Sequence, residues 1–192
     1  MLLDTKGVVT SRFFEPAYRD RVTVGSVLAR LGNRLDVPVT KVISPQVNIT
    51  TYTTNSTVAL GTNFSLVLDV APGRKMHVYA PGVTGYKPIT LTLQPPPGVQ
   101  VKAAQFPKPE EYYFAPLKDR VQVYMQPFRI VQDLAVDASP EGRAALKGVS
   151  ELVVKGTPTY QACDDKLCYT PQIVPLSWTV QLGGLDTERA KK

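Results

Sequence analysis

Apolar side chains recur at every second position along most of this chain from about residue 46 onward. The alternation is clearest over residues 64–70, 89–94 and 121–126, where apolar residues are followed mostly by polar ones. A period of two predicts strands that bury one face and expose the other. Further strand candidates are 47–54, 75–80, 99–104, 130–136, 150–162 and 174–182. Since turn residues separate these runs and no helical pattern falls between them, we expect an all-β fold, an antiparallel β-sandwich.

The chain before residue 46 has a different pattern. Its apolar residues follow the spacing of one helical face: Val24, Val27, Leu28 and Leu31. Thr23 can cap the start of this helix and Gly32 can end it. Residues 32–47 are rich in turn-forming residues and are typical of a linker.

These patterns divide the chain into three parts. We expect a helical segment and linker over residues 1–45, a β-sandwich over 46–183, and a polar tail over 184–192. The proline- and aromatic-rich stretch 104–116 is too long for a tight turn, so we expect an exposed functional loop there.

Composition narrows the possible chemistry. The chain has 192 residues, 43% of them hydrophobic, two cysteines and a single histidine, and its formal charge is +6. Two thiols and one imidazole are too few for a closed tetrahedral zinc site, so we expect no metal and no cofactor. Basic residues are scattered and lack interleaved aromatic residues, so we expect no nucleic-acid partner. No apolar run reaches the roughly 20 residues that span a bilayer, so we expect no direct membrane insertion.

The two cysteines lie five positions apart between two strand candidates. Asp164 to Leu167 form a suitable four-residue hairpin loop, which would set Cys163 opposite Cys168. Directly opposed residues on antiparallel strands have Cα atoms roughly 4.5–5.5 Å apart, within reach of a disulfide.

Three interpretations of this pair are open: a redox-active disulfide, a structural disulfide, and two unrelated thiols. Closing so short a loop should stabilise the fold by only about 2 kcal/mol, against about 4.7 kcal/mol for a loop of a hundred residues. A bond that stabilises so little favours a redox role. Asp164 and Asp165 lie beside the thiols, and like charge disfavours a thiolate. We therefore expect a sluggish nucleophile that depends on a partner protein to uncover and activate it.

The residues around the pair resemble a known family. Tyr160-Gln161-Ala162-Cys163, then Cys168-Tyr169-Thr170-Pro171 and Val174-Pro175-Leu176, are similar to the N-terminal periplasmic domain of the thiol:disulfide interchange protein DsbD. The resemblance covers roughly residues 50–182, including Asp119-Arg120-Val121 and His77-Val78-Tyr79. It implies an immunoglobulin-like sandwich and a periplasmic or otherwise extracytoplasmic location.

The resemblance also implies roles for particular residues. Cys168 would form the mixed disulfide with thioredoxin-fold partners, and Cys163 would resolve it. An aromatic cap loop would shield the pair, here Tyr112, Tyr113 and Phe114. Further residues expected to line the site are His77, Tyr79, Tyr160 and Tyr169. The loop between the cysteines is one residue shorter than in the best-known members, and His77 replaces an aromatic residue; we expect a partly exposed histidine on a strand.

The N-terminal piece resembles another protein class. Ser11-Arg12-Phe13-Phe14-Glu15-Pro16, continuing to Leu28-Ala29-Arg30-Leu31-Gly32, is similar to the tail of redoxin or peroxiredoxin-like proteins. Since the first residues show no signal-peptide pattern, we expect either a cytosolic protein or a mature or truncated piece of a longer one. The full-length protein would then carry a redoxin or a membrane electron-transfer module.

Parts of the sequence also suggest two other function classes. A non-catalytic β-sandwich binding domain with a structural disulfide would fit the glycosylation sequons at Asn48, Asn55 and Asn63. The sequence excludes a peroxidase, the second class, because neither cysteine lies between a predicted strand and a predicted helix. The sequence favours a thiol:disulfide exchange module, a protein-disulfide reductase if it is an enzyme, that relays electrons through Cys163 and Cys168.

Overall fold

Two packed β-sheets and a smaller third sheet form the body of the molecule. The computed structural model describes residues 2–3, 6, 9–11, 21–33, 35–44, 46–114 and 118–183. The first sheet has the order β10 (Val99–Gln105), β13 (Phe128–Val136), β7 (Thr62–Pro72), β5 (Val47–Thr53) and β4 (Thr40–Ile43), and β3 (Arg21–Val22) also pairs with β7. The second has the order β16 (Gln172–Ile173), β14 (Glu151–Tyr160), β17 (Leu176–Leu182) and β6 (Thr57–Val58), and β9 (Thr90–Gln94) also pairs with β14.

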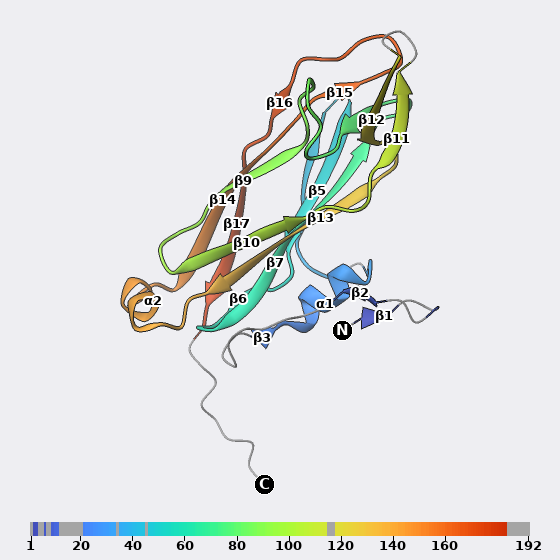
Figure 1. Cartoon of the computed structure of the whole chain (residues 1–192). Helices are drawn as coiled ribbons and strands as arrows, with labels where there is room; N and C mark the ends of the chain where they lie inside the picture. Colours follow the sequence, from blue (N-terminus) through green and yellow to red (C-terminus); the bar gives the residue numbers. More distant parts are fainter. Residues whose placement is uncertain are drawn as a thin grey trace.

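The third sheet contains Cys163. Its order is β11 (Glu110–Phe114), β12 (Asp119–Tyr124), β8 (His77–Tyr79) and β15 (Ala162–Cys163). It lies at one end of the elongated molecule, whereas the short helix α2 (Pro140–Ala145) lies at the opposite end (Figure 1). A separate two-stranded ribbon pairs β1 (Leu2–Leu3) with β2 (Val9–Ser11).

Alternating side chains of the two large sheets meet in one core. Phe64, Leu66 and Leu68 of β7 are fully buried there with Trp178 and Val180 of β17. The Trp178 indole Nε1–H donates a hydrogen bond of 2.8 Å to Thr51 Oγ1, which ties the second sheet to the first. Two sheets packed face to face around one core form a β-sandwich, which confirms the expected fold class.

The outer face of β7 is also buried, contrary to the expectation of one exposed face. Helix α1 (Val24–Arg30) lies across the first sheet (Figure 1) and contacts β7. Val67 on this outer face is fully buried with Ala29 and Tyr52. Tyr124 requires a similar correction, because it alternates with the apolar residues Val123 and Met125, which predicts an exposed side chain. It is only 4% exposed and belongs to the main core.

The helix forms where its pattern predicts it, but it packs through a different face. Thr23 caps it by accepting a hydrogen bond from Ser26 N–H. The buried positions are Ser26 and Ala29, whereas Val24 is 75% and Leu31 50% exposed. Small side chains allow the helix to approach the sheet closely.

Polar contacts attach this helix to the sheet. Ser65 Oγ lies 2.9 Å from Ser26 Oγ and donates a hydrogen bond to Asp133 Oδ1 at 2.6 Å. Arg30 forms an ion pair with the same Asp133. Arg129 pairs with Asp69 on β7 and donates to the carbonyl of Ala29. Within the described parts, the N-terminal segment thus packs on the sandwich rather than lying apart from it.

Two loops contain elements that the sequence pattern did not indicate. Residues 40–43, within the expected linker, form β4 and pair with β5 at the edge of the first sheet. Residues 140–145, within an expected loop, form α2, whose N-terminus is capped by Ser139. Residues 12–20, which hold most of the redoxin-like motif, and the polar tail 184–192 lie outside the described residues. The boundary at residue 46 stays a prediction.

Candidate functional site

A tight hairpin brings the two cysteines together. Cys163, the last residue of β15, forms an antiparallel bridge with Cys168. The bridge is flanked by hydrogen bonds from Asp164 N–H to Leu167 O (3.0 Å) and from Tyr169 N–H to Ala162 O (2.9 Å). The cysteines therefore occupy a non-hydrogen-bonded pair, where Cα atoms approach most closely.

Asp164 organises the loop between the cysteines. Its Oδ1 accepts hydrogen bonds from the backbone N–H groups of Lys166 (2.7 Å) and Leu167 (2.8 Å). Its Oδ2 accepts a third from the Tyr169 hydroxyl at 3.0 Å. These donors, the backbone N–H groups first, lower the pKa of Asp164 below its ordinary value. The Asp164 carboxylate thus stabilises the turn by accepting its backbone hydrogen bonds, as in an Asx-turn.

Cys163 and Cys168 form a disulfide whose two sulfur-bearing residues differ in accessibility. Their Cα atoms are 4.0 Å apart, and the expected hairpin pairing is confirmed. Cys163 is only 1% exposed, whereas Cys168 lies on the surface. An attacking thiolate can therefore reach Cys168 far more readily than Cys163.

One face of the third sheet forms a small core around Cys163. In this sheet Cys163 lies directly opposite His77, and Tyr79, two residues further along β8, lies opposite Val123 of β12. Cross-strand partners share a face, and so do residues two apart on a strand. The buried members of this cluster are Tyr79, Val121, Val123 and Cys163. Ala162 and Val78, on the opposite face, belong to the main core.

His77 is buried, which corrects the expectation of a partly exposed histidine. It is 3% exposed because Tyr79 meets it edge-on at 5.4 Å and Tyr112 covers it at 4.6 Å between ring centroids. Burial lowers the pKa of His77 from its ordinary value of 6.5, and the nearby Asp165 and Asp164 oppose this shift.

Tyr79 contacts the disulfide directly. Its hydroxyl lies 3.6 Å from Cys168 Sγ, and because a disulfide sulfur carries no hydrogen, the hydroxyl is the donor. Burial, followed by the neighbouring Tyr86 and Tyr112, raises the pKa of Tyr79 to about 12. The hydroxyl therefore keeps its proton and remains a donor at neutral pH.

The aromatic segment expected to be a cap loop is a strand. Glu110–Phe114 forms β11, paired with β12 at the edge of the third sheet. Strand alternation turns Tyr112 toward the cysteines, where its hydroxyl donates a hydrogen bond of 2.9 Å to Asp165 Oδ1 in the hairpin loop. Phe114, on the same face, stacks at 6.5 Å from Tyr112.

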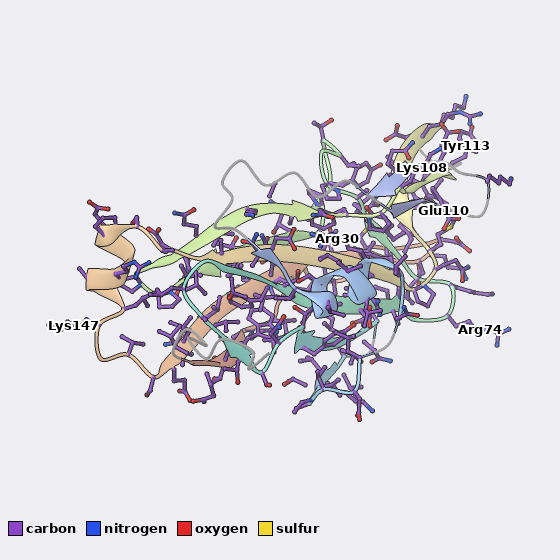
Figure 2. All side chains as sticks on the ribbon, turned by 90° about the horizontal axis from the view of Figure 1, so that it is seen from below. Arg30, Arg74, Lys108, Glu110, Tyr113 and Lys147 are labelled. Atoms are coloured by element: carbon purple, nitrogen blue, oxygen red, sulfur yellow. A yellow bond between two sulfur atoms is a disulfide. The ribbon has the colours of Figure 1, made fainter. Side chains whose placement is uncertain are left out.

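Tyr113 points to the other face of that strand. It is 50% exposed, and Arg120 lies 5.3 Å above its ring. It is found at the end of the molecule away from Lys147 (Figure 2). The structure thus brings Tyr112 to the hairpin and leaves Tyr113 outside the site.

The two remaining expected residues have different locations. Tyr169 belongs to the hairpin, through its hydroxyl contact with Asp164. Tyr160 does not line the site: it is 1% exposed in the main core, and its hydroxyl lies 3.0 Å from Ser44 Oγ. Tyr160 precedes Cys163 by three residues, so strand alternation directs it to the opposite face.

One site residue was missed by sequence reasoning. The ring of Tyr86, in the loop after β8, stacks on Tyr79 with centroids 4.3 Å apart. The turn residues Pro81-Gly82 predict only a break between two strands at this point. No local pattern reveals that a loop residue folds back on a strand, so this contact required the tertiary structure.

Within the described residues, no group of three or more histidine, cysteine, aspartate or glutamate side chains could hold a metal ion. In the same part of the chain, no helix has the length and apolar character needed to cross a membrane. The chemistry that this site can support is thiol–disulfide exchange at the accessible Cys168: a partner's thiolate can attack the disulfide, and the reduced pair can attack a partner's disulfide.

A family model described as thiol:disulfide interchange protein DsbD, N-terminal, matches residues 46–174. None of the curated proteins compared with the chain matches it. The matched range contains the disulfide hairpin and all of the third sheet.

Several solved structures are similar to the chain at low identity. The N-terminal periplasmic domain of ScsB from Proteus mirabilis has 13% identity and a TM-score of 0.48, over 73% of this chain and 49% of that one. The complex between the DsbD N-terminal and PilB N-terminal domains from Neisseria meningitidis gives 17% and 0.41, over 59% and 73%. The reduced DsbD N-terminal domain of that species gives 17% and 0.39, over 61% and 81%. The chain spans about half the length of the ScsB domain.

Proposed function

The chain belongs to the DsbD N-terminal family of thiol:disulfide interchange proteins, and we propose that it relays electrons to or from thioredoxin-fold partners through Cys163 and Cys168. The observation that carries this proposal is the unequal accessibility of the bonded pair, with Cys168 on the surface and Cys163 buried. Such a pair allows a partner to bond to one defined sulfur.

The exchange proceeds in two balanced steps. In the reduced domain, the Cys168 thiolate attacks one sulfur of the partner's disulfide, and the partner's other sulfur leaves as a thiolate that takes a proton from water. Cys163 then loses its proton and attacks Cys168 Sγ, which releases the partner's first sulfur as the second thiolate. The domain is oxidised by two electrons and the partner's disulfide is reduced. The same steps run backward when the partner is the reductant.

Neighbouring residues have defined tasks in this scheme. The Tyr79 hydroxyl, 3.6 Å from Cys168 Sγ, can donate a hydrogen bond to the thiolate that forms there. Asp165, held by Tyr112, places a negative charge in the loop beside it and opposes that thiolate. Because Tyr112 ties strand β11 to the hairpin loop, it acts as the shielding residue that a docking partner would displace.

We also infer an extracytoplasmic place for this domain, in the periplasm, where disulfides form and persist. The family match supports this location. The sandwich over residues 46–183 would be the exchange domain, joined in the full-length protein to a redoxin or a membrane electron-transfer module.

A trapping experiment tests the exchange function. The probe is a purified thioredoxin whose second active-site cysteine is replaced by serine and whose first is bonded to thionitrobenzoate. The reduced Cys163→Ser variant should displace thionitrobenzoate, measured by its absorbance, and form a covalent complex on a non-reducing gel. Cys168→Ser is the matched control and should react far more slowly, since its remaining thiol is buried. Equal reaction of the two variants, or none by either, would refute the relay.

A further inference from the structure

The loop between β8 and β9 is built to place one aromatic side chain over the site. Its two ends are held together by a hydrogen bond of 2.8 Å from Ile89 N–H to Tyr79 O. Gly82 and Gly85 have φ angles of +86° and +81°, a region that favours glycine. The turn at Gly85 directly precedes Tyr86 and returns the chain toward the sheet.

Tyr86 is fixed at both ends of its side chain. Its ring stacks on Tyr79 with centroids 4.3 Å apart and an interplanar angle of 24°. Its hydroxyl donates a hydrogen bond of 3.1 Å to Asp119 Oδ2, at the start of β12. Tyr86, which is half-buried, is thus held by Asp119 at its hydroxyl and by Tyr79 at its ring.

The ring under Tyr86 is the one that reaches the reactive sulfur. Tyr79 is held on one side by the edge contact with His77 and on the other by Tyr86. Its hydroxyl lies 3.6 Å from Cys168 Sγ. A contiguous chain of contacts therefore runs from Asp119 through Tyr86 and Tyr79 to Cys168.

We propose that Tyr86 is a positioning residue for the exchange reaction: by stacking on Tyr79, it holds the Tyr79 hydroxyl against Cys168 and so sets how readily Cys168 acts as a nucleophile. The proposal rests on the proposed exchange function and deepens it. A phenol hydroxyl held at this sulfur favours the thiolate over the thiol. Without the stacked ring, Tyr79 can turn away and the thiolate loses its donor.

Tyr112 and Tyr86 have different tasks at this site. Tyr112 covers His77 and binds the hairpin loop, so its release uncovers the site. Tyr86 instead stacks on Tyr79 and donates a hydrogen bond to Asp119. Removing Tyr86 should therefore change the reactivity of Cys168 at a given pH.

The test measures alkylation of Cys168 by iodoacetamide as a function of pH, in the full chain carrying Cys163→Ser so that one thiol remains. Adding Tyr86→Ala should move the midpoint of the pH profile upward by about one unit, which slows alkylation about tenfold at neutral pH. Tyr86→Phe keeps the stack and should restore the parent midpoint to within about 0.3 unit. Tyr113→Ala, on the opposite face, is the matched control and should leave the profile unchanged.

Two results would overturn the proposal. One is a pH profile of alkylation whose midpoint is unchanged in Tyr86→Ala. If alkylation is at the same time faster at every pH, Tyr86 only covers the site. The other is an unchanged midpoint in Tyr79→Phe, which would show that the hydroxyl does not act on Cys168. Circular dichroism and thermal unfolding establish that each variant is folded. If the parent profile is normal but no mixed disulfide forms with the thioredoxin probe, the exchange function fails independently of Tyr86.

Discussion

His77, the only histidine of the chain, lies directly opposite Cys163 on neighbouring strands and is buried there. Tyr79 and Tyr112 enclose the ring on two sides, and Asp164 and Asp165 are the charged groups that act on it. The charge state of His77 is therefore coupled to the packing of the site.

The stability of the domain should depend on this histidine in mild acid. Because burial lowers the pKa of His77 in the folded state, the unfolded chain binds a proton more readily below pH 6.5. Buried, neutral His77 therefore does not oppose folding above pH 6.5. As the pH falls from 6.5 toward the lowered pKa of the folded state, the free energy of unfolding decreases. Urea unfolding should give a falling free energy from pH 7 to 5 in the parent, and a flatter one in His77→Phe. Identical slopes would contradict this. Asp164, with its lowered pKa, contributes a separate loss below its ordinary value of 3.8.

The two cysteines should differ in reactivity once the disulfide is reduced. Cys168 is exposed and Cys163 is 1% exposed, so brief treatment with iodoacetamide should modify Cys168 at least about tenfold faster. Mass spectrometry of the separated peptides measures the ratio. In urea, where both thiols are accessible, the ratio should fall toward one. A preference for Cys163 in the folded domain would exclude the assigned roles.

Tyr112 should slow reduction of the disulfide. Tyr112→Phe keeps the ring over His77 but removes the hydrogen bond to Asp165, so strand β11 no longer holds the hairpin loop. A hydrogen bond worth about 1 kcal/mol gives an increase of about fivefold at most in the rate of reduction by dithiothreitol. Tyr113→Phe serves as the control because its ring lies on the other face. Equal rates for both variants would show that the hydrogen bond from Tyr112 to Asp165 does not slow reduction.

Helix α1 should tolerate no side chain at Gly25. A Cβ there would lie 2.3 Å from the carbonyl oxygen of Thr54, a backbone atom that cannot move cheaply. In an exposed helix, glycine to alanine stabilises by nearly 1 kcal/mol. Gly25→Ala should instead lower the free energy of unfolding by about 1–3 kcal/mol, measured in urea. Val24→Ala, at a position 75% exposed, should change it little. Stabilisation by Gly25→Ala would mean that the helix does not pack closely on the sheet.

Much of the fold follows from local patterns. The alternation in residues 64–70 and 121–126 predicts strands where β7 and β12 occur, and Thr23 predicts the start of α1. The hairpin of Cys163 and Cys168 also follows from spacing, because a four-residue loop between two strands leaves little freedom in how they pair.

Two expectations about burial, for helix α1 and for His77, are wrong for the same physical reason: burial depends on what covers a face. The helix was expected to bury its larger apolar residues, but close packing on β7 selected Ser26 and Ala29 instead. The histidine was expected to be partly exposed, but Tyr112 covers it from another strand. Both outcomes depend on partners that are distant in the sequence.

The sequence by itself predicted most of the strands, the β-sandwich they build, and a hairpin that sets Cys163 opposite Cys168, since strand periods and hairpin loops depend on spacings within a few residues. Only the tertiary structure decided which sulfur is accessible, that His77 faces Cys163, and that Tyr86 stacks on the tyrosine nearest Cys168. These relationships arise from strand order and from a loop folding back on a sheet. No local pattern encodes them, because each joins segments that meet only when the sheets have formed.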